Sequence, residues 1–236
     1  MFTYDPAVRV VLIHGSGGNA RSAWASVQPL ARRFDLVTPD RSGYPPNPPL
    51  ERIDFELQAD ELAPLLEGGA HLVGHSYGGV IALLMAARRP DDVRSLVVSE
   101  PPAFALARGN PEVDALVERL DRHFTHGPRD PREFAEGFLA LVGTGAQLPD
   151  PLPPDLEQSI RATMAERPPW EAEIPLDELA ETRFPKLVIS GGHHPAFDAV
   201  CDVLEGHLPA ERAVVPGTGH GIPRAPGYVG VLERFL

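Results

Sequence analysis

Residues 72–82 have the sequence LVGHSYGGVIA, in which an apolar run leads into a Gly-x-Ser-x-Gly core and a helix-forming run follows. This order predicts a strand, one sharp turn that carries Ser76, and a helix, the arrangement called a nucleophile elbow. Such a turn strains the backbone of its serine, and the small Gly74 and Gly78 make the turn possible. We expect the Ser76 hydroxyl to lie above the helix N-terminus, where free N–H groups favour developing negative charge.

The composition is typical of a globular protein with one large domain, or with a core and an insertion. The chain has 236 residues, of which 43% are apolar and 23% charged. A formal net charge of −12 argues against nucleic acid or an anionic membrane surface as a partner. Cys201 is the only cysteine, so no disulfide can form within the chain. Residues 1–6 lack signal-peptide features, and no apolar run approaches ~18 residues. We therefore expect a cytoplasmic protein that does not span a membrane.

Strand patterns and helix patterns alternate along two parts of the chain. Apolar, β-branched runs predict strands at residues 8–13, 35–39, 70–74, 93–99, 186–190 and 212–215. Amphipathic patterns predict helices at residues 22–33, 54–66, 76–89, 195–208 and 226–236. This alternation indicates a doubly wound α/β fold with a mainly parallel sheet of about six strands and helices on both faces.

The rhythm changes between residues 101 and 182, where no β-rich run occurs. Helical patterns near residues 111–124, 131–142, 153–166 and 176–182 are separated by breaks rich in proline and glycine. We therefore expect residues 101–182 to form an inserted helical cap, or lid. Residues 1–100 and 183–236 would then form the α/β core.

Residues that could carry chemistry follow the expected strands. In parallel sheets the ligand site lies outside the carboxyl ends of the strands, so these residues should gather at one edge. They are His14, Ser16, Asp40, Ser76, Glu100, His193 and His220.

A serine hydroxyl becomes a good nucleophile when a histidine takes its proton and a carboxylate orients that histidine. His220 is the best candidate for this base, because it lies in a glycine-rich loop after the last expected strand, late in the chain. The neighbouring His193 and His194 are its main rivals, although solvated loop histidines would look the same. Catalysis by Ser76 would also need N–H donors for an oxyanion. We expect these donors to be the backbone N–H groups of Tyr77 and Ser16.

Three motifs together resemble the α/β-hydrolase fold family: His14-Gly15, the elbow at residues 74–79, and the late Gly219-His220. The resemblance covers residues 8–100 and 184–236, and it covers the cap by position alone. It implies a serine hydrolase that acts on esters, lactones, thioesters or amides without a cofactor. It also implies a cap that helps to shape the substrate pocket.

The sequence departs from the family pattern in two places. Members usually begin with an antiparallel hairpin, but only seven residues precede Val8, so the hairpin should be absent or reduced to residues 2–4. The acid of the triad usually follows the strand that lies here at residues 187–190. The next residues are GGHHP (191–195), which contain no carboxylate.

Glu100, at the end of the strand after the nucleophile helix, is the favoured acid. The sequence is similar in this respect to certain haloalkane dehalogenases and fungal-toxin lactonases of the family, which place the acid there. Asp198 is the alternative acid, but its position in the first turn of a helix would also suit a simple interaction with the helix dipole. Asp40, or no acid at all, remains open.

Other chemistries do not fit the residue types. A dehalogenase or epoxide hydrolase of this fold would carry aspartate in place of Ser76. His193-His194 is a weak signal for zinc, and the chain has no HxxxH or CxxC spacing, so we expect no metal. The glycine-rich loops match neither a P-loop nor a dinucleotide fingerprint, so we expect no cofactor.

The sequence thus predicts a carboxylic ester hydrolase that cleaves a small to medium hydrophobic ester or lactone through a Ser76–His220–Glu100 triad and an acyl-enzyme. The alternatives are a thioesterase of a biosynthetic pathway, or a non-hydrolytic ligand-binding or cyclase-like member of the fold. The sequence leaves open the substrate and the choice between monomer and homodimer. Candidates for the pocket wall are Phe104, Leu106, Leu116, Leu120, Phe124, Phe134, Phe138, Leu139 and Trp170.

Overall fold

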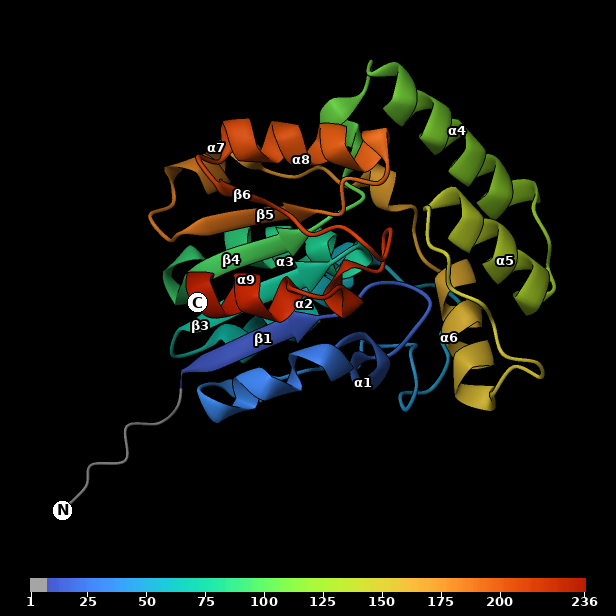
Figure 1. The fold of residues 1–236 in the computed structure, drawn as a ribbon, viewed down its shortest axis with the longest axis horizontal. Helices are drawn as coiled ribbons and strands as arrows, with labels where there is room; N and C mark the ends of the chain where they lie inside the picture. The colour runs from blue at the N-terminus through green and yellow to red at the C-terminus, as the bar shows by residue number, and fades with distance from the viewer. Residues whose placement is uncertain (1–7) are drawn as a thin grey trace.

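A parallel β-sheet forms the centre of the protein (Figure 1), as seen in a computed structural model that describes residues 8–236. Six strands lie in the order β2-β1-β3-β4-β5-β6, and every neighbouring pair is parallel. The strands are β1 (Arg9–Ile13), β2 (Asp35–Val37), β3 (Ala70–His75), β4 (Val93–Ser99), β5 (Lys186–Ser190) and β6 (Glu211–Val214). The expected fold class is therefore confirmed. The expected loss of the N-terminal hairpin at residues 2–4 concerns residues outside those described.

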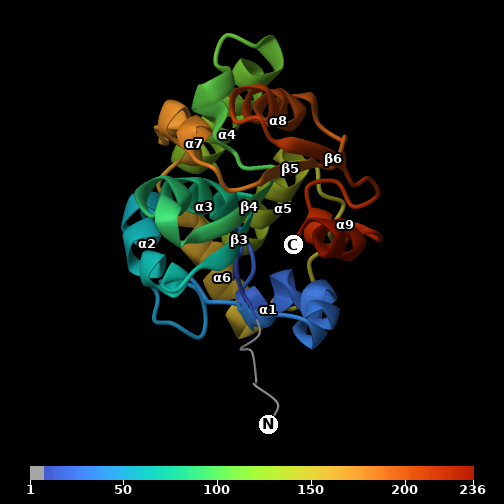
Figure 2. The same cartoon turned by 90° about the vertical axis from the view of Figure 1, so that its left-hand side faces the viewer.

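The apolar runs form strands because alternate side chains enter two separate cores. Val11 and Ile13 of β1 pack into the core on one face of the sheet. Val10 and Leu12 pack into the core on the other face. Both faces are therefore covered by helices, as the end-on view shows (Figure 2).

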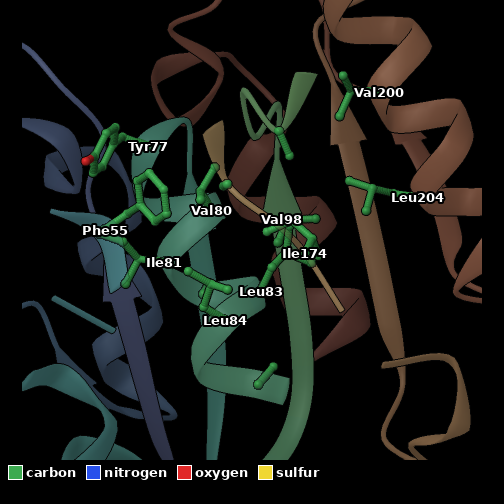
Figure 3. Close-up of a cluster of buried hydrophobic side chains, with 14 of the residues drawn as sticks. Phe55, Tyr77, Val80, Ile81, Leu83, Leu84, Val98, Ile174, Val200 and Leu204 are labelled. Atoms are coloured by element: carbon green, nitrogen blue, oxygen red, sulfur yellow. The ribbon is translucent and has the colours of Figure 1, made fainter. Parts of the chain in front are cut away.

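The helices of the first face are α2 (Phe55–Leu62), α3 (Tyr77–Arg88), α7 (Leu176–Glu181) and α8 (Pro195–His207). Figure 3 shows side chains of this core on α2, α3, β4 and α8, among them Phe55, Val80, Val98 and Val200. The second face carries α1 (Ala20–Ala23), a 3-10 helix η1 (Ala25–Arg32) and α9 (Tyr228–Phe235). No helix in the described part of the chain is both long and apolar enough to traverse a lipid bilayer.

One expected helix is wrong in type. Residues 22–33 do not form a single α-helix; a single turn of α-helix, α1, is followed by the 3-10 helix η1. Pro29 lies inside this segment and has no N–H to donate to the carbonyl four residues earlier, which disfavours a continuous α-helix. The amphipathic pattern still places Val27 and Leu30 against the sheet.

Between β4 and β5, residues 101–182 form a helical segment at the carboxyl ends of the strands (Figure 1). Its longer helices are α4 (Pro111–His126), α5 (Pro131–Leu141) and α6 (Pro154–Met164). Each begins with proline, which suits the first position of a helix because its missing N–H has no partner there anyway. Asn110 and Asp130 cap α4 and α5 through their side chains.

Six short 3-10 helices complete the described residues. Besides η1, they are η2 (Ala63–Leu66), η3 (Pro90–Asp92), η4 (Phe104–Ala107), η5 (Pro169–Glu171) and η6 (Ile222–Arg224).

The helical segment is also paired with the core just after α6. Ile53 and Glu166 form a parallel bridge, in which Ile53 N donates to Ala165 O at 2.9 Å and Arg167 N donates to Ile53 O at 2.7 Å.

The strand order places the site. The chain moves from β1 outward to β2 and then returns to β3 on the other side of β1. Ligands bind at such a switch point, outside the carboxyl ends of the strands. Ile13 at the end of β1 pairs with Gly74 near the end of β3, so the loops that follow these two strands lie next to each other.

Candidate active site

Ser76 occupies a strained turn between β3 and α3. Its φ of 54° and ψ of −128° are rare for a residue with a side chain. The turn needs small neighbours: a Cβ on Gly74 would lie 2.7 Å from the Cβ of Ala82, and a Cβ on Gly78 would lie 2.5 Å from the carbonyl oxygen of His14. The sequence pattern therefore predicts this turn correctly, and Ser76 directly precedes the first residue of α3.

A chain of hydrogen bonds joins Ser76, His220 and Glu100. His220 Nε2 lies 2.8 Å from Ser76 Oγ, and His220 Nδ1 lies 2.7 Å from Glu100 Oε2. An ionised carboxylate can only accept, so Nδ1–H donates to Glu100, which leaves Nε2 to accept the Ser76 hydroxyl. All three residues are buried. The structure thus brings together the three residues that the sequence placed after β3, β4 and β6.

Glu100 follows β4 and is held by several donors. Its backbone has a φ of 44°, and its N–H donates to Ile189 O at 3.0 Å. Its Oε1 accepts the Gly191 N–H at 2.6 Å. Burial alone would raise the pKa of Glu100, but interactions with His193 and His220 and the Gly191 N–H outweigh burial and lower the pKa to about 2. The carboxylate is therefore ionised at neutral pH.

His193 lies on the other oxygen of the same carboxylate. Its Nδ1 is 3.3 Å from Glu100 Oε1, close enough for an ion pair but without the geometry of a hydrogen bond. Its Nε2 donates to the carbonyl of Val142, at 3.1 Å, in the helical segment. The Glu100 carboxylate raises the pKa of His193. Of the two rival histidines, His193 therefore faces the acid, and His194 instead caps α8 by accepting from Ala196 N.

The alternative acids lie elsewhere. Asp198, in the first turn of α8, has its Oδ1 3.5 Å from Arg212 Nη2. Asp40 accepts the N–H of Ala20 at 2.8 Å, at the start of α1. Among residues 8–236, one group of three side chains could hold a metal ion, and it consists of Glu100, His193 and His220. Two of these three already share the hydrogen bond that orients His220.

The two expected oxyanion donors flank Ser76. Gly15 packs so closely on the elbow that a Cβ on it would lie 2.8 Å from the Cβ of Ser76, which places the neighbouring Ser16 beside the nucleophile. Tyr77 is the first residue of α3, where N–H groups have no partner within the helix. The side chain of Ser16 donates to Glu166 Oε2 at 2.5 Å, so its hydroxyl is engaged away from its backbone N–H.

His14 stabilises the loop after β1 through hydrogen bonds and is not part of the chain from Glu100 to Ser76. It is fully buried: its Nε2 accepts the N–H of Arg41 at 3.1 Å, and its Nδ1 donates to Gly15 O at 2.8 Å. Burial and the Arg41 charge hold the pKa of His14 well below its usual value of 6.5. His14 is therefore neutral in the folded protein at neutral pH.

These two histidine shifts predict opposite effects on stability. As pH falls below 6.5, the unfolded chain protonates His14 and the folded protein does not, so His14 lowers the free energy of unfolding by up to about 1.4 kcal/mol per pH unit. The stabilisation from His193, whose pKa is raised, is complete below the unfolded pKa and is lost as pH rises through the folded pKa. Urea unfolding at several pH values measures both slopes.

The matched variants are His14→Asn and His193→Asn. We expect His14→Asn to flatten the loss of stability between pH 6.5 and 5.5, and His193→Asn to flatten the opposite slope above pH 6.5. Slopes identical to the parent protein in both variants would contradict these protonation states, whatever the absolute stability of each variant.

Two cavities adjoin Ser76. The larger, about 230 Å³, lies between the loop at residues 15–18, the end of α5 and the loop that carries His220. The smaller, about 20 Å³, is lined by apolar side chains of the helical segment and the core. Phe138 and Val142 line both cavities. The larger cavity therefore offers space for an apolar group bound to Ser76, and Phe138 and Val142 form part of its wall.

Most, but not all, of the residues expected in the pocket wall are there. Those that line a cavity beside Ser76 are Phe104, Leu120, Phe124, Phe138, Leu139 and Trp170. Leu106 and Leu116 pack in the main core, and Phe134 packs with Ile160 in a smaller cluster. These three candidates do not line a cavity beside Ser76, since helical periodicity shows which face of a helix is buried but not which surface covers it.

Arg41 and Glu166 were not predicted from the sequence as residues of the site. Their side chains form an ion pair of 2.6 Å that is almost wholly buried next to the loop at residues 14–17. Arg41 stands two residues before Gly43 in a polar turn, and Glu166 lies two residues beyond the end of α6, so neither carries a sequence signal that distinguishes it from a surface residue.

An all-parallel sheet with a serine at the turn after β3, joined to a histidine and a glutamate from later strands, defines the class of α/β proteins built around a nucleophile elbow. Residues 10–229 match the model of the alpha/beta hydrolase family. The chain belongs to this family, as the motifs of its sequence led us to expect.

Individual relatives agree with this assignment. A protein of Aeromonas hydrophila subsp. hydrophila, named pimeloyl-(acyl-carrier protein) methyl ester esterase, is 29% identical over 247 residues, which cover 96% of this chain and 94% of that protein. A protein of the same name from Chromobacterium violaceum is 35% identical over 144 residues, 58% of this chain and 54% of that protein. The solved structure of an alpha/beta hydrolase from Sphaerobacter thermophilus has a TM-score of 0.69 at 24% identity and covers 98% of this chain and 93% of that one. The expected enzyme class, carboxylic ester hydrolase, agrees with these names.

Proposed function

We propose that the protein is a serine hydrolase that cleaves carboxylic esters of small to medium hydrophobic substrates through an acyl-enzyme. The observation that carries the proposal is the hydrogen-bonded chain from Glu100 through His220 to Ser76, at the edge of a cavity of about 230 Å³. The names of the relatives support ester cleavage. Residues 101–182 act as the cap in this proposal, because their apolar side chains enclose the space beside Ser76.

In the first half-reaction, His220 Nε2 accepts the proton of Ser76 as Oγ forms a bond to the ester carbonyl carbon. The carbonyl oxygen becomes an oxyanion, which accepts hydrogen bonds from the N–H groups of Ser16 and Tyr77. The ester C–O bond then breaks, and the proton on Nε2 passes to the departing alkoxide. The ionised Glu100 stabilises the imidazolium throughout.

In the second half-reaction, water takes the place of the alcohol. His220 Nε2 removes a proton from this water as its oxygen adds to the acyl carbon, and the same two N–H groups bind the oxyanion again. The bond to Ser76 Oγ breaks, and the proton on Nε2 returns to the serine. The products are the alcohol, the carboxylic acid and the unmodified protein.

Labelling with a fluorophosphonate probe tests the nucleophile, because the probe reacts with activated serines. We expect the native protein to be labelled at Ser76 and the Ser76→Ala variant to remain unlabelled. A folded native protein that is not labelled would overturn the proposal.

Rates on a methyl ester, a lactone and an acyl thioester with the same acyl chain then rank the substrate classes. We expect the ester to give the highest kcat/KM; a faster thioester would identify a thioesterase, and binding without turnover a non-hydrolytic protein.

Phe138 lines both cavities beside Ser76, so it should limit the size of the acyl or alcohol group. Its ring stacks on Phe134 with centroids 6.2 Å apart and meets Phe124 edge-on at 5.9 Å. Phe138→Ala is expected to raise kcat/KM for longer esters relative to acetate by about tenfold, since a methylene or two in an apolar pocket has this effect. The measurement is a series of p-nitrophenyl esters from C2 to C8. Leu139→Ala is the matched control, because Leu139 lines the larger of the two cavities beside Ser76 and not the smaller, and an unchanged preference in Phe138→Ala would contradict the assignment.

A further inference from the structure

A buried ion pair lies beside the proposed site and takes no part in the chain from Glu100 to Ser76. Arg41 Nη2 and Glu166 Oε1 are 2.6 Å apart, and their side chains are 0% and 2% exposed. Stability alone does not account for such a pair, because burying two charges costs about as much as their attraction returns. The other hydrogen-bond partners of these two side chains therefore indicate the role of the pair.

Glu166 and Arg41 fix the loop that follows β1. Glu166 Oε2 accepts the hydroxyl of Ser16 at 2.5 Å. Arg41 Nη2 donates to the carbonyl of Gly15 at 3.1 Å, and the Arg41 N–H donates to His14 at 3.1 Å. The side chains of the ion pair thus bond Gly15 and Ser16, and the backbone of Arg41 bonds His14. Ser16, the expected oxyanion donor, is bonded through its side chain, which leaves its backbone N–H for the oxyanion.

The same ion pair reaches the second oxyanion residue. The Arg41 guanidinium lies between two aromatic rings, 4.3 Å from the centroid of Tyr44 and 4.7 Å from that of Tyr77. The Tyr77 hydroxyl donates to the carbonyl of Arg167 at 3.2 Å. The side chains of Ser16 and Tyr77, which come from loops after different strands, are therefore tied to the adjacent residues Glu166 and Arg167.

The segment that carries Glu166 and Arg167 is itself bonded to the core. Residues 165–167 pair with Ile53 of the core by two backbone hydrogen bonds. The Tyr44 hydroxyl donates to Glu166 Oε1 at 2.7 Å, and Thr163 Oγ1 accepts the N–H of Gly17 at 2.9 Å. Thr163, near the end of α6, and Glu166, just beyond it, thus both bond to the loop after β1.

We propose that Glu166 is a positioning residue: by accepting the Ser16 hydroxyl, it orients Ser16 so that the Ser16 N–H faces the oxyanion. Arg41 supports this arrangement, because its guanidinium pairs with Glu166 and packs on the ring of Tyr77. The proposal rests on the proposed function, since it needs an oxyanion at Ser76. A donor that is displaced by a fraction of an ångström loses most of its effect in the transition state, while substrate binding changes little. In this proposal the oxyanion site is complete when the helical segment is packed against the core, because Glu166 belongs to that segment.

Ser16→Ala is the sharpest test, because it removes the hydroxyl and keeps the backbone N–H. We expect kcat to fall between about 10-fold and about 100-fold with KM nearly unchanged. Affinity for a trifluoromethyl ketone, which forms a tetrahedral oxyanion on Ser76, should fall by the same factor. Glu166→Gln should cause at least as large a loss, and Ser16→Ala should add little in the Glu166→Gln background, because the bond between the two is already absent.

Ser42→Ala is the matched control. Ser42 Oγ donates to Glu61, a serine–glutamate bond of 2.5 Å outside the site, and its loss should leave kcat and inhibitor affinity unchanged. Wild-type kcat and ketone affinity in folded Ser16→Ala would overturn the positioning role, even if its Tm were lower. Ser16→Ala decides the question if Glu166→Gln does not fold. Failure of the proposed function is distinct, since it would appear as a folded native protein that the fluorophosphonate does not label, or as ester hydrolysis that survives in Ser76→Ala.

Discussion

Ser76→Ala is expected to lower kcat for ester hydrolysis by about 10⁶-fold, the effect of removing the nucleophile from a serine hydrolase. The geometry explains why no other group should replace it. Ser76 Oγ is 2.8 Å from His220 Nε2, whereas the Ser16 hydroxyl is bonded to Glu166. Any activity that remains should come from the oxyanion donors and from substrate binding. Steady-state kinetics with p-nitrophenyl butyrate measure the loss, and mass spectrometry of the acylated protein identifies the residue.

Ser22→Ala is the control for this experiment. Ser22 lines the larger cavity, as Ser76 does, but its side chain exchanges hydrogen bonds with Asn19 at the start of α1. Its loss should change kcat by no more than about twofold. Ser76→Ala keeps the backbone strain of the elbow, since alanine has a Cβ in the same place, so both variants should fold like the parent. Comparable activity in Ser76→Ala and the parent protein would remove Ser76 from the mechanism.

The strand ends explain how much of the fold and site could be predicted. A parallel sheet collects at one edge whatever follows its strands, so Ser76, Glu100 and His220 could be placed together without knowledge of their distances. The family was predicted from the three motifs around His14, Ser76 and His220, and the fold class from the alternation of strand and helix patterns. The expected α-helix at residues 22–33 was wrong because periodicity does not register that Pro29 interrupts the hydrogen bonds of an α-helix.

Contacts between distant segments could not be predicted. Arg41 and Glu166 are 125 positions apart in sequence, and their pairing depends on how the end of α6 docks against Ile53. The role of His193 depends in the same way on a carboxylate from another strand. Since a helical pattern specifies a buried face but not the surface that covers it, the network around the proposed oxyanion donors required the structure.

Glu100→Gln is expected to lower kcat by about 10⁴-fold, with little change in KM. The environment of Glu100 determines how a glutamine would be oriented. The Gly191 N–H donates to Oε1 at 2.6 Å, so the oxygen of the amide should remain there and its NH2 should face His220. An NH2 group cannot accept the proton on Nδ1. His220 would then carry its proton on Nε2, the tautomer that cannot take a proton from Ser76.

Asp198→Asn is the matched control for Glu100→Gln, because it removes the charge of the alternative acid without a change in shape. Asp198 is one-third exposed and lies 3.5 Å from Arg212, so we expect its kcat to stay within about twofold of the parent value. The pair of variants therefore discriminates between the two carboxylates in one assay. A large loss in Asp198→Asn together with parental activity in Glu100→Gln would assign the acid to α8. It would also require the chain from Glu100 to His220 to break during catalysis. The low pKa of Glu100 argues against that rearrangement, since separating the ionised carboxylate from its donors would leave a buried charge without partners.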